Sequence, residues 1–141
     1  MIPLFPHPAR TTTLAIAVAA LGAVPGHAIA DLSENEDVFA RLLNVAIAHE
    51  IRDKCETISA RELKAKLRML NIYRFAKGLG YTHDEITTYT KDKAEQERLR
   101  QATYAFLDEN GVDREEVTGY CALGEVEIEN ASPIGKLLRI D

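Results

Sequence analysis

Apolar side chains recur every three or four residues through most of the chain after residue 30, which is the spacing of one face of an α-helix. The first run begins at a capping box predicted from Ser33 to Glu36 and continues to about Arg52. The second begins at a similar box, Ser59 to Glu62, and ends at Gly78 and Gly80. Its apolar stripe is predicted to face the core and comprises Leu63, Leu67 and Leu70, with Met69, Ile72, Tyr73 and Ala76 alongside.

The stretch 83–109 is predicted to be either one long helix or two helices. A third capping box, Thr82 to Glu85, opens it, and residues 92–95 resemble a fourth. The threonines before this point are weak helix formers, which favours two helices with a joint near Thr90.

The pattern changes again at Asn110-Gly111, a strong stop signal, and residues 113–116 are predicted to start the next helix. Its stripe comprises Val117, Cys121, Gly124 and Ile128. Acidic and apolar residues alternate over 125–129, as in a strand, but a helix is favoured because no partner strand is visible. Ser132-Pro133 predicts a last turn within 134–140, or a short docking segment if this tail does not pack. The predicted fold class is therefore all-α: a single domain over residues 31–141, forming a small bundle of about five helices.

The first thirty residues have a different composition. They contain no Asp or Glu, one charged side chain (Arg10), an apolar run over 14–24 and then Ala28-Ile29-Ala30. This layout predicts a cleavable signal peptide over residues 1–30. The alternative is an uncleaved N-terminal anchor, although the run is shorter than the roughly 20 residues that cross a bilayer. We expect an exported, soluble, periplasmic protein, whose formal charge changes from −5 to −6 when Arg10 is removed with the leader.

The two cysteines, Cys55 and Cys121, both follow the predicted leader. In an oxidising compartment such a pair most often forms a disulfide. Closing a loop of about 66 residues stabilises a fold by roughly 4 kcal/mol in the chain-entropy model. A redox pair and a metal site are the alternatives, but no Cys-x-x-Cys spacing or neighbouring ligand set is present. We predict a structural disulfide between the first and fifth helices.

Three segments carry a resemblance to a known family. They are Cys55–Arg61 (CETISAR), Lys77–Tyr81 (KGLGY) and Gly119–Cys121 (GYC). They resemble an uncharacterised family of small exported alphaproteobacterial proteins that have a signal peptide, a helical body and this cysteine pair. The resemblance implies that the gene lies near those of the respiratory NADH dehydrogenase, which makes a respiratory membrane complex one candidate among protein partners. It carries over no functional residues, because none are defined in the family.

The sequence contains no complete motif for catalysis or for binding a cofactor. His49-Glu50 followed by Asp53 lacks the second histidine of a zinc helix. The acidic run 108–113 has its glycine at the wrong position for a calcium loop. No Gly-x-Ser-x-Gly elbow is present, and Ser33, Ser59 and Ser132 are each predicted to cap a helix. We therefore expect no catalytic residues, no metal, no cofactor and no enzymatic activity.

A basic stripe on the second predicted helix is the candidate partner surface. It consists of Arg61, Lys64 and Arg68, with Lys66, Arg74 and Lys77 nearby. Three alternatives follow for what this stripe contacts: anionic lipid headgroups, an acidic protein surface, or solvent alone. Nucleic acid is not expected as the partner of an exported acidic protein. The favoured function is a periplasmic binding or accessory module that attaches to a larger protein or inner-membrane complex. A stress or holdase-type protein is the alternative, and a hydrolytic enzyme comes last.

Overall fold

The structure, a computed structural model, describes residues 30–141, so nearly all of the predicted leader lies outside the described residues. The chain forms, in order, η1 (Leu32–Glu34), α1 (Glu36–Lys54), β1 (Ile58–Ala60), α2 (Glu62–Gly78), α3 (His83–Lys91), α4 (Lys93–Glu109), α5 (Val117–Glu129), η2 (Gly135–Leu137) and β2 (Leu138–Ile140). Over these described residues, the prediction of a small, mainly helical fold with five helices and one disulfide is confirmed.

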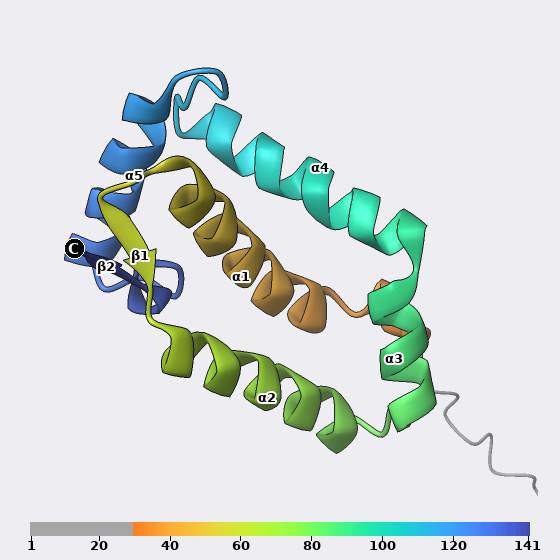
Figure 1. The fold of residues 1–141 in the computed structure, drawn as a ribbon. Helices are drawn as coiled ribbons and strands as arrows, with labels where there is room; N and C mark the ends of the chain where they lie inside the picture. Colours follow the sequence, from red (N-terminus) through yellow and green to blue (C-terminus); the bar gives the residue numbers. More distant parts are fainter. Residues whose placement is uncertain (1–29) are drawn as a thin grey trace, which may run out of the picture.

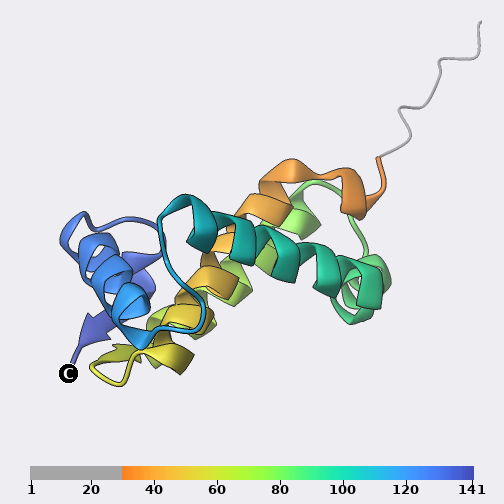
Figure 2. The same ribbon diagram turned by 90° about the horizontal axis from the view of Figure 1, so that it is seen from above.

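Helix α1 lies at the centre of the arrangement. Helices α2 and α4 pack against it from opposite sides (Figure 1), and α5 packs against its C-terminal half. Viewed from above, α5, the two short strands and the C-terminus gather at one end of the molecule, while η1 and α3 lie at the other (Figure 2). The long helices thus form a layer that is closed at both ends by shorter elements.

The buried side chains form two clusters, one at each end of α1. The cluster under α5 includes Ile51, Cys55 and Leu107, and the cluster under α3 includes Val38 and Ile72. Val45 of α1 packs against both clusters. Full burial of one such aliphatic side chain contributes about 1.5–3 kcal/mol. The two clusters together join α1 to the helices around it.

The helix starts agree only partly with the predicted capping boxes. Thr82 and Glu85 form the predicted box at the start of α3, and Asp92 caps α4. Residues 83–109 are therefore two helices, as predicted, with the joint at Asp92. The other two boxes are wrong. Asn35 rather than Ser33 accepts the hydrogen bond from Val38 N at the start of α1, and α2 begins after Arg61 without a side-chain cap, because Ser59 lies in β1.

The C-terminal part also departs from the prediction. Residues 113–116 form a turn, and α5 begins at Val117, whose side chain is exposed. β2 pairs antiparallel with β1, with Ile58 opposite Ile140, a pairing that was not predicted. Strands of three residues have too few positions to show alternation. The tail side chains Ile134, Leu137 and Leu138 are buried, so a free docking segment at 134–140 is excluded.

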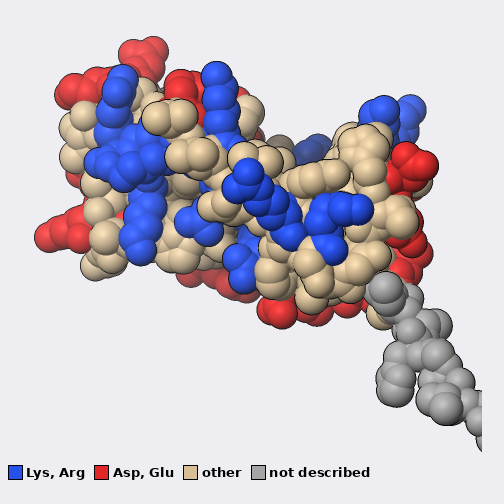
Figure 3. Space-filling model, turned by 90° about the horizontal axis from the view of Figure 1, so that it is seen from below, with Lys and Arg blue, Asp and Glu red and all other residues tan. Residues whose placement is uncertain are grey.

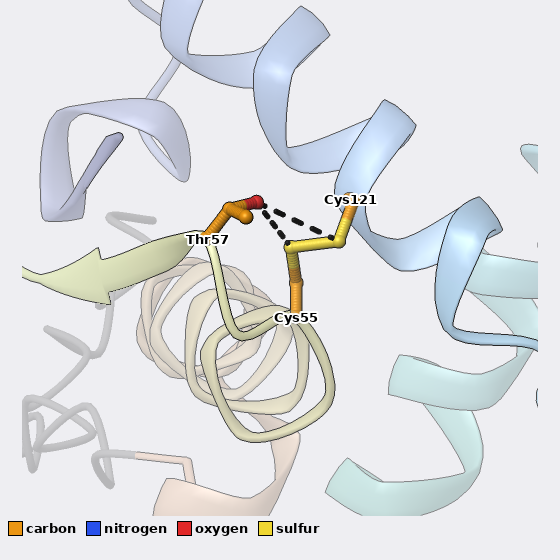
Figure 4. The surroundings of a disulfide bond; sticks show 3 residues. All are labelled: Cys55, Thr57 and Cys121. Carbon is orange, nitrogen blue, oxygen red and sulfur yellow. Dashed lines mark hydrogen bonds between the residues drawn. A yellow bond between two sulfur atoms is a disulfide. The ribbon is translucent and has the colours of Figure 1, made fainter. Parts of the chain in front are cut away.

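The disulfide joins the end of α1 to the middle of α5. Cys55 is the C-terminal cap of α1 and is buried, and Cys121 lies half-buried on α5. The hydroxyl of Thr57 lies 3.2 Å from Cys55 Sγ and 3.9 Å from Cys121 Sγ (Figure 4). The predicted pairing between the first and fifth helices is confirmed. It closes a loop with a sequence separation of 66 residues.

Replacing both cysteines by alanine should lower the free energy of unfolding by about 4 kcal/mol, because the denatured chain regains the entropy of the open loop. Urea denaturation followed by circular dichroism measures this. A reductant should destabilise the natural protein by a similar amount and leave the variant unchanged. Equal stability of the oxidised protein and the double variant would contradict the prediction.

Gly135 is predicted to tolerate no side chain, because a Cβ there would lie 1.9 Å from the carbonyl oxygen of Glu127. That atom belongs to the backbone of α5 and cannot swing away. Gly135→Ala should therefore lower the free energy of unfolding by at least 1–3 kcal/mol, roughly the cost of overpacking. Gly78→Ala is the control, since nothing lies within 4 Å of its added Cβ. Similar urea midpoints for both variants would show that the tail is loosely packed.

Candidate binding surfaces

The leucine stripe of α2 does not face the core. Leu63, Leu67 and Leu70 are 71%, 49% and 40% exposed, whereas Ile72 and Ala76 are the buried residues of the helix. At 3.6 residues per turn these two sets lie on nearly opposite sides of the helix. The prediction that the leucines pack inside is wrong. We call the row Leu63, Leu67 and Leu70 the leucine ridge.

The reason for the error is that α2 carries two apolar stripes. Both Leu63–Leu67–Leu70 and Ala65–Met69–Ile72–Ala76 have helical spacing, and the leucines are the larger side chains. Contacts with other parts of the chain bury one stripe rather than the other. Ile72 and Ala76 pack in one cluster with Val38 of α1, and Arg61 N donates to the carbonyl of Leu137. Val38 and Leu137 are distant from α2 in sequence, so periodicity alone does not select the buried stripe.

Cationic side chains lie on both sides of the leucine ridge. Of the predicted partner surface, Arg61 and Lys64 are exposed and Arg68 is half-buried. Lys66 and Lys77 follow the other flank by helical spacing. Within residues 30–141, the salt bridge that involves α2 joins its carboxylate, Glu62, to Arg52 of α1. The cationic side chains of α2 take part in no salt bridge within this range. Figure 3, the view from below α2 of Figure 1, shows Lys and Arg side chains across this face with Asp and Glu mainly toward its margins.

A second surface is a concave one. Helices α2 and α4 leave part of α1 uncovered between them, where the half-buried Leu42, Val45 and Ala46 form a floor. Three adjoining cavities, of about 330, 200 and 190 Å³, all include Leu42 and Met69 in their lining. They therefore form one trough along α1, which we call the apolar groove. Its walls come from α2, α3 and α4 and include Met69, Tyr73, Thr87, Thr90, Gln96, Leu99, Thr103 and Tyr104.

Two polar side chains of the groove lining, His49 and Arg100, are bound to neighbours outside the lining. His49 Nδ1 lies 3.1 Å from an Asp53 carboxylate oxygen, and its Nε2 accepts from Arg52 at 3.2 Å. On α4, Arg100 pairs with Glu97 and lies over the ring of Tyr104. The side chain of Gln101 donates to Glu97 and lowers the pKa of that carboxyl below its ordinary value, with Arg100 adding to the effect. These pairs leave the floor of the groove apolar.

The other residues weighed for chemistry have structural partners. Asn110 ends α4 and Gly111 has a positive φ of 71°, the conformation expected after a helix stop. Asp113 accepts from Glu115 N in the turn before α5. Ser132 accepts from Gly135 N, whereas the Ser59 hydroxyl donates to the Asp141 carboxylate. Among residues 30–141 the structure brings together no three His, Cys, Asp or Glu side chains in a metal-binding arrangement.

Helix α3 closes one end of the groove, and its capping box has a pH dependence. The Thr82 hydroxyl and backbone N both donate to Glu85 Oε2 and lower the pKa of that carboxyl below its ordinary value of 4.5. The stabilisation is complete above the pKa of the unfolded chain and is lost as pH falls through the lowered folded pKa.

Glu85→Gln should therefore reduce the loss of stability between about pH 6 and pH 2, because glutamine accepts the same bonds but does not titrate. Urea midpoints across this range measure the effect. Asp84→Asn is the matched control, since that exposed carboxylate of the same turn is outside the box and should change the pH profile less. Identical profiles for the two variants would contradict this role of Glu85.

None of the helices within residues 30–141 is both long enough and apolar enough to cross a bilayer.

Comparison with known proteins identifies the family of the chain. Neither the curated proteins nor the solved structures include a significant match to the chain. Residues 30–139 match the model of a family of unknown function, DUF5333, and the chain belongs to this family.

Proposed function

We propose that the protein is an exported accessory module that binds a larger protein, at the periplasmic side of an inner-membrane complex. In this proposal a helix of the partner docks in the apolar groove. The observation that carries it is the uncovered part of α1, where Leu42, Val45 and Ala46 lie half-buried between α2 and α4. The activity proposed is binding, not catalysis.

The shape of the groove suits a helix. Its floor is α1, its long walls are α2 and α4, and α3 closes one end, while its cavities adjoin along α1. An amphipathic helix laid into such a trough inserts apolar side chains at positions i, i+3, i+4 and i+7. A docked helix would complete a four-helix arrangement around the floor and remove Leu42, Met69 and Leu99 from water. Each fully buried side chain of this kind contributes about 1.5–3 kcal/mol before the cost of association.

Two features support export. The first is the leader pattern of residues 1–30, with a basic start, a short apolar run and Ala-x-Ala. The second is the disulfide between Cys55 and Cys121, a bond typical of oxidising compartments. The resemblance described above implies a gene neighbourhood with the respiratory NADH dehydrogenase, and on that ground we propose a respiratory membrane complex as the partner.

A holdase-type stress protein is the second candidate, and the leucine ridge is the observation that favours it. Leu63 and Leu67 present apolar surface that an unfolded client could cover. A holdase binds many clients, whereas an accessory module binds one partner in a fixed ratio. The identity and number of the bound proteins therefore separate the two functions.

A photoreactive amino acid in place of Met69, whose side chain is 42% exposed at the groove, should cross-link one protein in intact cells of the source organism. The same amino acid at Val126 of α5, which is 50% exposed and is not part of the groove lining, should give no such product. Mass spectrometry identifies the product. Ala46→Arg, which fills the groove floor, should reduce its yield at least about tenfold, as loss of a central anchor does in protein interfaces.

Circular dichroism and an unchanged urea midpoint must first show that Ala46→Arg remains folded. A folded variant that cross-links as well as the natural protein would overturn docking in the groove. A ladder of many products from Met69 would overturn the accessory function and support the holdase. Equal products from Met69 and Val126 would show that the groove has no special role.

A further inference from the structure

The leucine ridge has no partner among the described residues and lies outside the apolar groove. Its three side chains project from the side of α2 opposite the buried Ile72 and Ala76. We propose that this face of α2 lies flat on an anionic lipid bilayer, with the leucines among the headgroups and the neighbouring cations at the lipid phosphates. This surface and ligand go beyond the proposed protein partner.

The charge distribution supports an anionic surface. Residues 61–78 contain six cationic side chains and one carboxylate, Glu62. The chain as a whole has a formal charge of −5, so the remaining residues together carry −10. An anionic bilayer therefore attracts one face of the molecule and repels the rest. Each Lys or Arg near such a surface contributes about 1 kcal/mol at moderate salt, and the effect falls off within a Debye length.

The geometry of α2 matches a helix at a membrane interface. Leucines form the apex of the exposed face, and Lys64 and Lys66 lie on either side of it by helical spacing. Long lysine side chains at these positions can extend sideways to the phosphates while their methylene groups stay beside the leucines. This is the pattern of interfacial amphipathic helices. Here the opposite side of the helix is already fixed on α1, so binding requires no folding step.

The composition of this face favours lipid over a protein partner. Lysine is depleted in protein interfaces, and three of the six cations of residues 61–78 are lysines. The anchors of protein interfaces are mainly Trp, Tyr and Arg, whereas leucine is under-represented among them. The two aromatic side chains of α2 are already engaged within the protein. Tyr73 meets His83 edge to face, with 6.0 Å between ring centroids, and the Arg41 guanidinium lies 4.1 Å from the ring centroid of Phe75. The exposed face is left with leucines and flexible cations, which suit a fluid surface.

Co-sedimentation with lipid vesicles tests the proposal. Residues 31–141 contain both core clusters and the disulfide, and circular dichroism confirms the fold of each sample before use. We expect sedimentation with phosphatidylglycerol–phosphatidylcholine vesicles but not with phosphatidylcholine alone. Raising the salt from about 0.1 to 0.5 M should weaken binding several-fold, because the charges are screened.

Two double variants separate the apolar and the electrostatic contributions. Leu63→Gln with Leu67→Gln should lower the partition coefficient at least about tenfold, since the apolar contact is lost. Lys64→Gln with Lys66→Gln should lower it by a similar factor and reduce the dependence on salt. The matched control is Val117→Gln with Val126→Gln, two valines of α5 that are 52% and 50% exposed, which should bind as the natural protein does.

Three results would overturn the proposal: no sedimentation with anionic vesicles, equal sedimentation with zwitterionic vesicles, or unchanged binding by either α2 double variant. A protein surface would then be tested with a photoreactive amino acid at Leu67. A protein cross-link from Leu67 in a sample that does not bind vesicles would assign the leucine ridge to an acidic protein partner. Cross-linking from Met69 in the groove is a separate readout, so the two proposals can fail independently.

Discussion

The packing of α2, α4 and α5 against α1 is the constraint on which the fold depends. Ile47 and Ile51, on its C-terminal half, are almost completely inaccessible to solvent and join the cluster under α5. Val38, on its N-terminal half, joins the cluster under α3. A chain of this size buries only about two thirds of its unfolded surface, so it has little apolar area to lose. The disulfide at Cys55 then fixes the end of the helix that carries the larger cluster.

Local signals predicted where the helices begin and end better than they predicted which side of each helix is buried. The joint at Asp92 follows from threonines that disfavour helix and from an aspartate that caps the next one, both within a few residues. The capping box at Thr82 is equally local. Ser33 and Ser59 failed for a different reason, since a serine followed by a glutamate three residues later is only a candidate cap. Ser59 lies instead in β1, which pairs with β2, and that pairing joins residues about eighty positions apart.

The surface of α2 could not be predicted for a related reason. Periodicity shows that a helix has an apolar stripe, but a helix with two stripes needs its neighbours to decide which one is buried. Here Ile72 and Ala76 pack with Val38 of α1, and Arg61 N donates to the carbonyl of Leu137. The cations of the predicted partner surface were visible in the sequence, whereas the leucines between them were assigned to the core. The groove over Leu42 was missed as well, because a cavity depends on the spacing between helices.

The two surfaces differ in shape, and shape determines what each can bind. A concave apolar trough excludes water from three sides of a bound helix, so it can select one protein by its side chains. A convex ridge of leucines flanked by lysines selects only for an apolar layer under negative charge. Both surfaces use α2, with Met69 in the groove and Leu67 on the ridge. A module lying on a membrane through the ridge would hold the groove within reach of a helix from a membrane complex. Weak binding at each surface then suffices, because confinement to the membrane raises the effective concentration of the second partner.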